Sequence, residues 1–276
     1  MTQISVYIPT HNRVNLLKRA IESVLDQTFT NFEIIVVDDG SSDGTWDYLS
    51  ELAKENSKIR VFRNDKPKGA CFSRNLAINN AVGTYITGLD DDDYFMPSRL
   101  EMFYEKRNLL KNYSFISSSL RTFNDDGEGA LHYNYEKSIS LSALSCRNIV
   151  GNQIFTLTER IVYVDGFDTN LKAWQDYDMW LRLVEAFGTG IHFDLQSYRM
   201  DVSEDRVRIS NSTNRARGVL NFLHKHNLIL PDRFKSRYYA FSNVLLKENN
   251  KPLVKNIIPY YIFLFFYYLK FNMWLK

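Results

Sequence analysis

The segment YITGLDDDDYFMP, Tyr85–Pro97, sets four consecutive aspartates at the end of a run of strand-forming residues. Four carboxylates in so short a turn repel one another unless something compensates their charge. A divalent cation is one explanation, because hard cations take oxygen ligands. A solvated acidic turn is the other. The residues before Tyr85 bear on this choice because they predict where the aspartates lie in the fold.

The chain up to this segment alternates between strand and helix patterns. Runs of apolar residues predict buried strands, and apolar residues at helical spacing predict helices between them. The predicted strands are ISVYIP, FEIIVVDD, IRVFRN and TYITGLD, and the predicted helices are LLKRAIESVLDQ, GTWDYLSELAKE and GACFSRNLAINNA. This alternation predicts an α/β fold in which helices cover both faces of a parallel sheet.

Polar clusters follow three of the predicted strands: PTHNR after the first, DDGSSD after the second and DDDD after the fourth. Ligands of such sheets bind beyond the carboxyl ends of the strands, so we expect these clusters to meet at one site. An aspartate that ends the second strand suits a nucleotide. The first strand is not followed by a Gly-rich phosphate loop, which disfavours a Rossmann dehydrogenase.

The 276-residue chain is 45% hydrophobic and holds two cysteines. This length and composition predict one domain with an appendage, and two cysteines give no disulfide framework. The N-terminus has no charged and then apolar leader, so we expect a cytoplasmic protein. Residues 1–202 carry 21 Lys and Arg against 28 Asp and Glu, whereas residues 203–276 carry 13 against 4. The C-terminal part is therefore strongly basic.

The basic part ends in the aromatic segment IIPYYIFLFFYYLKFNMWLK, Ile257–Lys276. Its apolar core, Ile257–Leu269, is shorter than the roughly 20 residues that span a bilayer. Aromatic residues interleaved with lysines suit an anionic membrane surface, which predicts peripheral attachment to the inner face of the cell membrane. Packing on the core or in a homodimer interface is the alternative. Nucleic-acid binding is not expected, because only this tail is basic.

Six segments resemble, in order, the motifs of the GT-A glycosyltransferases of family 2, over about residues 3–200. They are VYIPTHNR, SVLDQTF, FEIIVVDDGSSDGT, GACFSRNLAI, YITGLDDDDYF and GFDTNLKAWQDYDMWLRL. The resemblance implies a GT-A fold, a Rossmann-like mixed sheet flanked by helices with a C-terminal helical appendage. It implies a catalytic domain at residues 1–202, with a nucleotide-sugar half at 1–95 and an acceptor half at 96–202. A flexible loop and the basic, aromatic helices would follow at 203–276.

The resemblance also implies a binding site for a UDP-sugar donor. A carboxylate suits this task because uracil N3 and the ribose hydroxyls are hydrogen-bond donors. The alternative for the acids after the second strand is a cap on the following helix. Arg206 and Arg208 belong to a polar stretch that would close over the phosphates, with a solvated loop as the alternative. The implied donor-binding residues are Pro9, Thr10, Asp39, Arg74, Asp90, Asp91, Arg206 and Arg208.

The family carries an Asp-x-Asp signature, which LDDDDY matches with Asp90 and Asp92. In this frame Asp90 faces the ribose, and Asp92 binds Mn²⁺ or Mg²⁺ at the diphosphate. The run also permits a frame with Asp91 and Asp93, in which Asp93 is the metal ligand. Family members typically have a small or neutral residue where this chain has Asp91.

WQDYDMWLRL predicts the start of an amphipathic helix and resembles the acidic motif of the family. Gln175 replaces the usual first acid, and Asp176 stands where the family has its catalytic base. Asp178 is expected on a different face of the helix. Gln153 and Trp174 lie where the family builds its sugar and acceptor pocket, with core packing as the alternative for the tryptophan.

These residues imply an inverting transferase that moves a hexose from a UDP-sugar, UDP-glucose or UDP-galactose, to a sugar hydroxyl. The acceptor expected for a membrane-attached enzyme is a lipid-pyrophosphate-linked saccharide of bacterial O-antigen, capsule or lipooligosaccharide. A noncatalytic sugar-nucleotide-binding relative is one alternative. A processive polysaccharide synthase is the other, but this chain has WLRL where such enzymes carry a Gln-x-x-Arg-Trp sequence.

Overall fold

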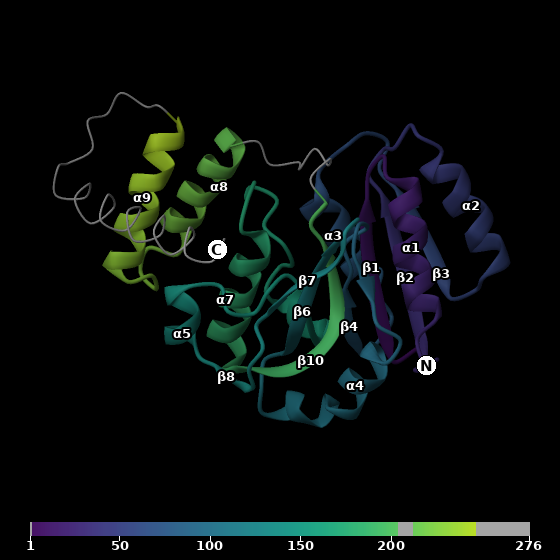
Figure 1. Cartoon of the computed structure of the whole chain (residues 1–276), viewed down its shortest axis with the longest axis horizontal. Coiled ribbons are helices and arrows are strands. Elements are labelled where there is room, and N and C mark those ends of the chain that lie inside the picture. Colours follow the sequence, from purple (N-terminus) through teal and green to yellow (C-terminus); the bar gives the residue numbers. More distant parts are fainter. Residues whose placement is uncertain (1, 204–211, 247–276) are drawn as a thin grey trace. The chain divides into compact units, whose positions relative to one another are not determined.

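A computed structural model describes residues 2–203 and 212–246 of the chain (Figure 1). Packing divides the chain into two compact units. One comprises Met1–Thr169 and Asp176–Arg206, and the other comprises Asn170–Gln175 and Val207–Lys276. This division reflects packing alone, so the assignment of catalysis to residues 1–202 stays a prediction.

Ten strands of the described residues form one sheet in the first unit, in the order β3-β2-β1-β4-β9-β6-β10-β5, with β7 on β6 and β8 on β10. The four N-terminal strands pair in parallel, as predicted, and antiparallel pairs beyond β4 make the sheet mixed. The strands are β1 (Ile4–Thr10), β2 (Phe32–Asp38), β3 (Ile59–Arg63), β4 (Tyr85–Gly88), β5 (Tyr94–Phe95), β6 (Ile116–Asn124), β7 (Gly127–His132), β8 (Lys137–Ile139), β9 (Ile154–Leu157) and β10 (Gly190–Asp201).

Helices cover both faces of the sheet (Figure 1). Successive side chains of a strand point to opposite faces, so β1 contributes to a separate core on each side. Val6 and Ile8 join the apolar cluster that includes Leu17 of α1. Tyr7, on the opposite face, meets Phe167 edge-on with ring centres 6.1 Å apart. The helices of this unit are α1 (Val14–Leu25), α2 (Thr45–Glu55), α3 (Ala70–Asn79), α4 (Arg99–Glu105), the 3-10 helix η1 (Arg107–Lys111), α5 (Leu141–Cys146), α6 (Thr158–Tyr163) and α7 (Gln175–Phe187).

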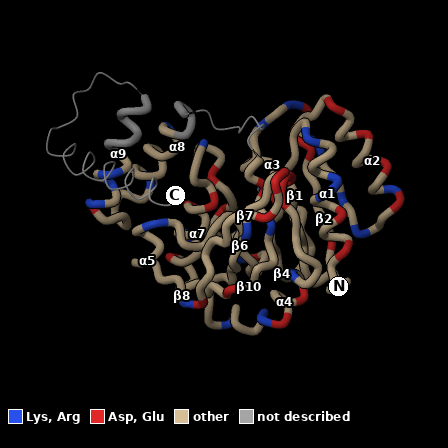
Figure 2. Tube along the Cα trace, viewed as in Figure 1, with Lys and Arg blue, Asp and Glu red and all other residues tan. Residues whose placement is uncertain are grey.

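The parallel register brings the polar strand ends together. Thr10 at the end of β1 pairs with Asp38 at the end of β2, and Tyr7 pairs with Gly88 at the end of β4. The chain segments that follow these strands therefore emerge at one edge of the sheet. Figure 2 shows acidic residues gathered at this edge, close to α3 and β1.

The second unit contains α8 (Ser212–Lys225) and α9 (Asp232–Leu246). Its core is aromatic: the Trp174 ring meets Phe222 at 5.1 Å and Tyr238 at 4.7 Å between ring centres, both edge-on. No helix among residues 2–203 and 212–246 is long and apolar enough to cross a membrane. The aromatic tail, Ile257–Lys276, lies outside the described residues, so its membrane attachment stays a prediction.

Candidate active site

Arg74 of α3 lies between two carboxylates. Its Nη2 donates to Asp90 Oδ1 at 2.8 Å, and its Nη1 lies 3.7 Å from Asp176 Oδ1. The arginine side chain is 9% exposed, and its plane lies over the Phe167 ring. Burial would lower the pKa of Arg74, but Asp90 and Asp176 outweigh burial and raise it. Arg74 is therefore a permanent cation that holds two acids from different elements beside each other.

Asp176, the second residue of α7, has one unsatisfied oxygen. Oδ1 is buried and makes no hydrogen bond, although the Asp176 side chain as a whole is 26% exposed. Burial raises the pKa of Asp176 to about 6, Arg74 opposes this shift, and Asp90 adds to it. A carboxylate with a pKa near neutrality and a free acceptor atom is suited to take a proton.

Two contacts hold α7 against the rest of the first unit. Asn75, the neighbour of Arg74, exchanges two hydrogen bonds of 2.7 Å with the main chain of Phe167. Arg182 of α7 pairs with Asp178 and donates to the carbonyl of Gly166 at 2.7 Å. Asp178 is fully buried in this pair, so it faces away from the position of Asp176. Both contacts end on the segment before α7 and fix where the helix begins.

Arg13, at the turn after β1, bridges the next two aspartates of the run. Its Nη1 donates to Asp91 Oδ1 at 3.0 Å and to Asp92 Oδ2 at 2.8 Å. Asp91 also accepts from Thr10 Oγ1 at 2.8 Å and is nearly buried, whereas the Asp92 side chain is 26% exposed. Burial raises the pKa of Asp91 to about 6, against the lowering effect of Arg13. Asp91 thus anchors the turn after β1, whereas Asp92 keeps part of its carboxylate accessible to solvent.

Asp93 points inward and is 2% exposed. Its carboxylate accepts from the Tyr198 hydroxyl at 2.5 Å, the Asp201 main-chain N–H at 2.8 Å and the Asn152 amide at 3.3 Å. Burial raises the pKa of Asp93 well above its usual range, and the neighbouring acids add to this effect. The three contacts tie the aspartate run to β10, so this geometry favours the frame with Asp92 over the frame with Asp93.

A buried polar layer lies beneath Asp90. Gln153 is 3% exposed and accepts from the Tyr7 hydroxyl at 3.2 Å, while its amide nitrogen lies 3.4 Å from Asp90 Oδ1. A Cβ on Gly88 would lie 2.2 Å from Gln153 Oε1 and 2.3 Å from Tyr7 Cζ. Only glycine leaves room for this pair. Gln153 is therefore engaged below the site, and its contact with an acceptor stays a prediction.

Asp39 follows β2 and organises the loop before α3. Its Oδ1 accepts from Asn64 Nδ2 at 2.7 Å and from the Lys68 N–H at 2.9 Å, and its Oδ2 accepts from the Gly69 N–H at 2.7 Å. A carboxylate oxygen can accept two hydrogen bonds, so Oδ2 keeps capacity for one further donor. The neighbouring Asp38 is fully buried and accepts from the Ser41 N–H, which is a structural role.

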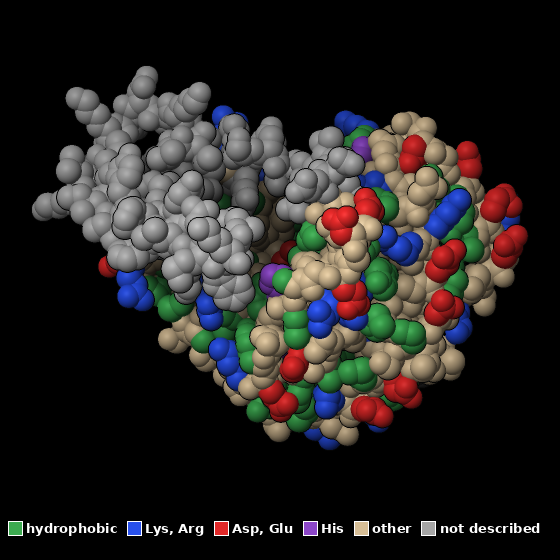
Figure 3. Space-filling view, viewed as in Figure 1, with side chains coloured by type: hydrophobic (Ala, Val, Ile, Leu, Met, Phe, Trp, Pro, Cys, Tyr) green, Lys and Arg blue, Asp and Glu red, His purple; other side chains and the backbone are tan. Residues whose placement is uncertain are grey.

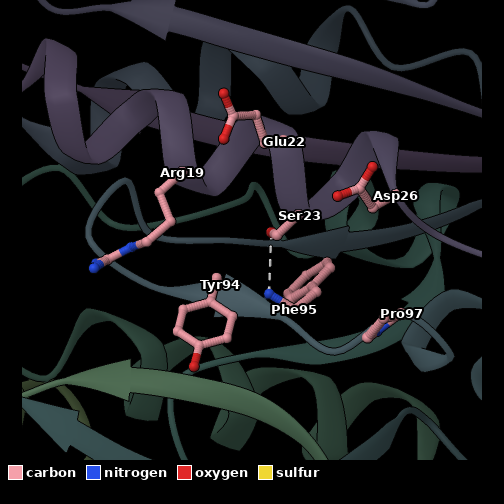
Figure 4. Close-up of a pocket in the computed structure, with 7 residues that line it drawn as sticks. All are labelled: Arg19, Glu22, Ser23, Asp26, Tyr94, Phe95 and Pro97. Carbon is pink, nitrogen blue, oxygen red and sulfur yellow. Dashed lines mark hydrogen bonds between the residues drawn. The ribbon is translucent and has the colours of Figure 1, made fainter. Parts of the chain in front are cut away.

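A pocket next to α1 lies close to the aspartate run (Figure 4). Arg19 extends from α1 and donates to the main-chain carbonyl of Asp92 and, at 2.9 Å, to the Asp201 carboxylate. Arg19 thus supports the main chain of the run, while Arg13 contacts its side chains. The pocket is lined by Arg19, Glu22, Ser23, Asp26, Tyr94, Phe95 and Pro97.

The predicted site residues are largely brought together. Pro9 is the last residue but one of β1 and pairs with Val37 of β2. The other predicted residues of the first unit are Thr10, Asp39, Arg74, Asp90 to Asp93, Gln153 and Asp176. Trp174 belongs to the second unit, in its aromatic core, so an acceptor role for it stays a prediction. Arg206 and Arg208 lie outside the described residues.

Arg13, Asn152 and Tyr198 are site residues that sequence reasoning missed. Arg13 stands in the PTHNR cluster and Asn152 is the neighbour of Gln153, so both lie in or beside sequence features already considered. Tyr198 carries no local signal, because it reaches Asp93 from a strand more than a hundred residues further along the chain.

Charge elsewhere on the first unit is mixed. On the face seen in Figure 3, Lys and Arg side chains are interspersed with Asp and Glu side chains. Among the residues that the structure describes, no three His, Cys, Asp or Glu side chains form a ready-made metal site. Mg²⁺ commonly takes only one or two protein carboxylates and completes its shell with substrate phosphates. The partly exposed Asp92, with Asp90 next to it but one in the chain, fits that kind of site.

Residues 5–167 match the family model described as glycosyl transferase family 2. The chain belongs to this family. It is 36% identical over 255 residues to WcaA of Escherichia coli K12, which is named provisionally as a colanic acid biosynthesis glycosyl transferase. The match covers 91% of this chain and 89% of WcaA. The chain also spans about 40% of longer glycosyltransferases from Rickettsia felis and Rickettsia conorii.

A second relative is WfaP of E. coli, a UDP-Glc:alpha-D-GlcNAc-diphosphoundecaprenol beta-1,3-glucosyltransferase. It is 27% identical over 194 residues, covering 67% of this chain and 71% of WfaP.

Solved structures confirm the predicted GT-A fold of this glycosyltransferase. Staphylococcus aureus TarS, crystallised with UDP-GlcNAc, superposes with a TM-score of 0.62 at 18% identity, over 94% of this chain and 78% of that chain. The mannosyltransferase PcManGT of Pyrobaculum calidifontis, in complex with GDP-Man and Mn²⁺, gives a TM-score of 0.59 at 15% identity, over 89% and 72% of the two chains.

The free energy of unfolding should distinguish the two frames of the aspartate run, one with Asp92 accessible and Asp93 buried, the other with the roles reversed. Asp93→Ala leaves three donors around a buried site without their acceptor, so we expect the free energy of unfolding to fall by about 2 to 4 kcal/mol. Asp92→Ala removes a partly exposed carboxylate, and we expect a change of less than about 1 kcal/mol. Urea denaturation of both variants measures this difference. Equal losses would contradict the inward position of Asp93.

Proposed function

We propose that this glycosyltransferase moves a hexose from a UDP-sugar to a sugar hydroxyl of a lipid-linked acceptor, with inversion at the anomeric carbon. Family membership carries the transfer of a glycosyl group, and the donor, acceptor and stereochemistry are the proposal. The observation that supports it most is the buried Oδ1 of Asp176, which makes no hydrogen bond and lies beside the Arg74–Asp90 pair. This arrangement supports the proposal of a proton acceptor next to the predicted donor site.

The donor would bind along the carboxyl ends of β1, β2 and β4. The remaining acceptor capacity of Asp39 Oδ2 suits the N3–H of uracil, and Pro9 and Thr10 would border the base. Arg74 fixes Asp90 toward the ribose. TarS was solved with UDP-GlcNAc and WfaP is named for UDP-Glc, which supports a UDP-sugar here. UDP-glucose and UDP-galactose are the candidates.

Asp92, with Asp90 beside it, would hold Mn²⁺ or Mg²⁺ together with the diphosphate of the donor. Both carboxylates keep about a quarter of their exposure, so oxygen atoms face the site. The Mn²⁺ in the PcManGT complex supports a divalent cation. When bound, such an ion stabilises negative charge on the departing diphosphate. The protein supplies the oxygen ligands and excludes Asp93 from this role by burying it.

Asp176 would act as the general base. Its carboxylate takes the proton of the acceptor hydroxyl while that oxygen attacks the anomeric carbon from the side opposite UDP. Bond formation on that side inverts the configuration. Arg74 keeps Asp176 and Asp90 in a fixed relation through the reaction, because its two terminal nitrogens face one acid each.

The acceptor would be a lipid-pyrophosphate-linked saccharide used in bacterial surface polysaccharide synthesis, such as O-antigen, capsule or lipooligosaccharide. The names of WfaP, with a diphosphoundecaprenol acceptor, and of WcaA support this class. Peripheral attachment through Ile257–Lys276 on the inner face of the membrane would bring the site to such an acceptor. That part of the proposal rests on the charge and aromatic pattern of the sequence.

Asp176→Asn tests the base. The amide keeps the shape of the side chain but cannot take a proton, so we expect kcat to fall by about 10²-fold or more with little change in donor affinity. Glu185→Gln removes the same charge from an exposed position on the same helix and should leave kcat unchanged. An Asp176→Asn enzyme with the turnover of the wild type would assign the base to another residue.

The pH dependence of kcat/KM provides an independent test. The base must be ionised, and burial raises the pKa of Asp176 to about 6. We therefore expect kcat/KM to be constant above this pH and to fall about tenfold for each pH unit below it. An acid limb that begins near pH 4, the usual range of an exposed aspartate, would contradict the buried environment of Asp176.

A donor screen tests the whole proposal. UDP release is measured from a panel of UDP-hexoses with a lipid-pyrophosphate-linked sugar as acceptor, in MnCl₂ and in EDTA. We expect one hexose to be transferred, only with metal present, and NMR of the product to show inversion. Transfer in EDTA would contradict the metal. Nucleotide binding without any transfer would favour a noncatalytic relative.

A further inference from the structure

Arg13 pairs with the carboxylate of Asp92, which the proposed metal would need as a ligand. One nitrogen, Nη1, donates to both Asp91 and Asp92, at 3.0 and 2.8 Å. The two carboxylates differ in burial, because the Asp91 side chain is 8% exposed and that of Asp92 is 26% exposed. Arg13 itself is 21% exposed. The guanidinium is therefore anchored on a buried acid and reaches out to an accessible one.

The acids of the run are thus compensated by the chain itself when no ligand is bound. Arg74 pairs with Asp90, and Arg13 pairs with Asp91 and Asp92. A metal ion that arrives alone meets an aspartate already paired with a cation. To bind Asp92, it must displace a charge-assisted hydrogen bond and bring its own charge close to Arg13.

A metal ion that arrives with a nucleoside diphosphate meets a different balance. Like carboxylate oxygens, phosphate oxygens are good acceptors for a guanidinium. They can therefore replace the acceptor that Arg13 loses at Asp92. The bond to Asp91 keeps the side chain near the site during this exchange. The added negative charge of the diphosphate also offsets the repulsion between Arg13 and the metal.

We propose that Arg13 makes metal binding depend on the nucleotide: it covers Asp92 in the ligand-free protein and moves to the diphosphate when donor and metal bind together. This inference rests on the metal site of the proposed function. Arg13 is a positioning residue in this account, because it controls access to Asp92. By linkage, the nucleotide raises metal affinity by the same factor as the metal raises nucleotide affinity.

Arg19 offers a matched control for charge. It is an arginine that contacts the same aspartate, but it donates to the Asp92 main-chain carbonyl and to the Asp201 carboxylate. Arg19→Gln therefore removes a positive charge next to the run without removing the bridge between Asp91 and Asp92. Arg13→Lys keeps the charge of the bridge and serves as the conservative variant.

The test is Mn²⁺ binding to the full-length protein, followed by EPR of free Mn²⁺, with and without UDP. In the wild type we expect UDP to raise Mn²⁺ affinity. Arg13→Gln should raise nucleotide-free Mn²⁺ affinity by about 2- to 5-fold, the range expected for a partly exposed ion pair, and should shrink the gain from UDP. Arg13→Lys should lie closer to the wild type, and Arg19→Gln should raise the UDP-free affinity by clearly less than Arg13→Gln does.

Asp92→Asn separates this inference from the function on which it rests. If Asp92→Asn loses Mn²⁺ but Arg13→Gln does not raise nucleotide-free affinity, the role of Arg13 is wrong and the metal site stands. If Mn²⁺ binds Asp92→Asn as it binds the wild type, the proposed metal site itself fails. An equal rise in Arg19→Gln and Arg13→Gln would reduce the effect to general charge and overturn the inference. Circular dichroism melts identify any variant that has not folded.

Discussion

Repulsion among carboxylates at the carboxyl ends of the parallel strands is the constraint on which the site depends. The register of β1, β2 and β4 brings the aspartate run and Asp39 to one edge of the sheet, and Arg74 joins Asp90 of the run to Asp176 of α7. Without ligands, this charge is compensated by Arg13 and Arg74 and by hydrogen bonds from neutral groups. Each compensating group comes from a different element, so the charge balance also fixes the positions of those elements.

Four consecutive aspartates acquire four environments because their neighbours differ. Asp90 pairs with an arginine and stays partly exposed, and Asp91 anchors the turn after β1. Asp92 also stays partly exposed. Asp93 is buried among donors of β10 and residue 152. A run of identical side chains thus separates into buried, structural aspartates and partly exposed ones, to which we assign the proposed ligand-binding roles. Asp38 and Asp39 differ in the same way, because Asp38 caps a turn and Asp39 keeps capacity for one further donor at Oδ2.

The N-terminal half of the fold was predictable because its patterns are local. The apolar spacing of residues 16–25 predicts the helix that the structure shows at Val14–Leu25, with Leu17, Ala20, Ile21 and Val24 buried. The antiparallel strands were harder, since β10 pairs with β6 about 75 residues away and shifts register between Phe193 and Tyr198. The sequence could not predict which aspartate of the run faces inward, because consecutive residues of a turn follow neither the helical nor the strand period. The bridge from Arg13 likewise joins positions 78 and 79 residues apart.

We infer that a divalent cation and the diphosphate of a nucleotide together replace Arg13 in compensating the charge of Asp92. Anomalous diffraction from crystals of the full-length protein soaked with MnCl₂ and UDP would test this exchange. We expect a single strong Mn²⁺ peak bound by an Asp92 oxygen and by phosphate oxygens, with Asp93 still bonded to Tyr198. Bound UDP with no Mn²⁺ peak at Asp92, or with the ion held by Asp93, would contradict it.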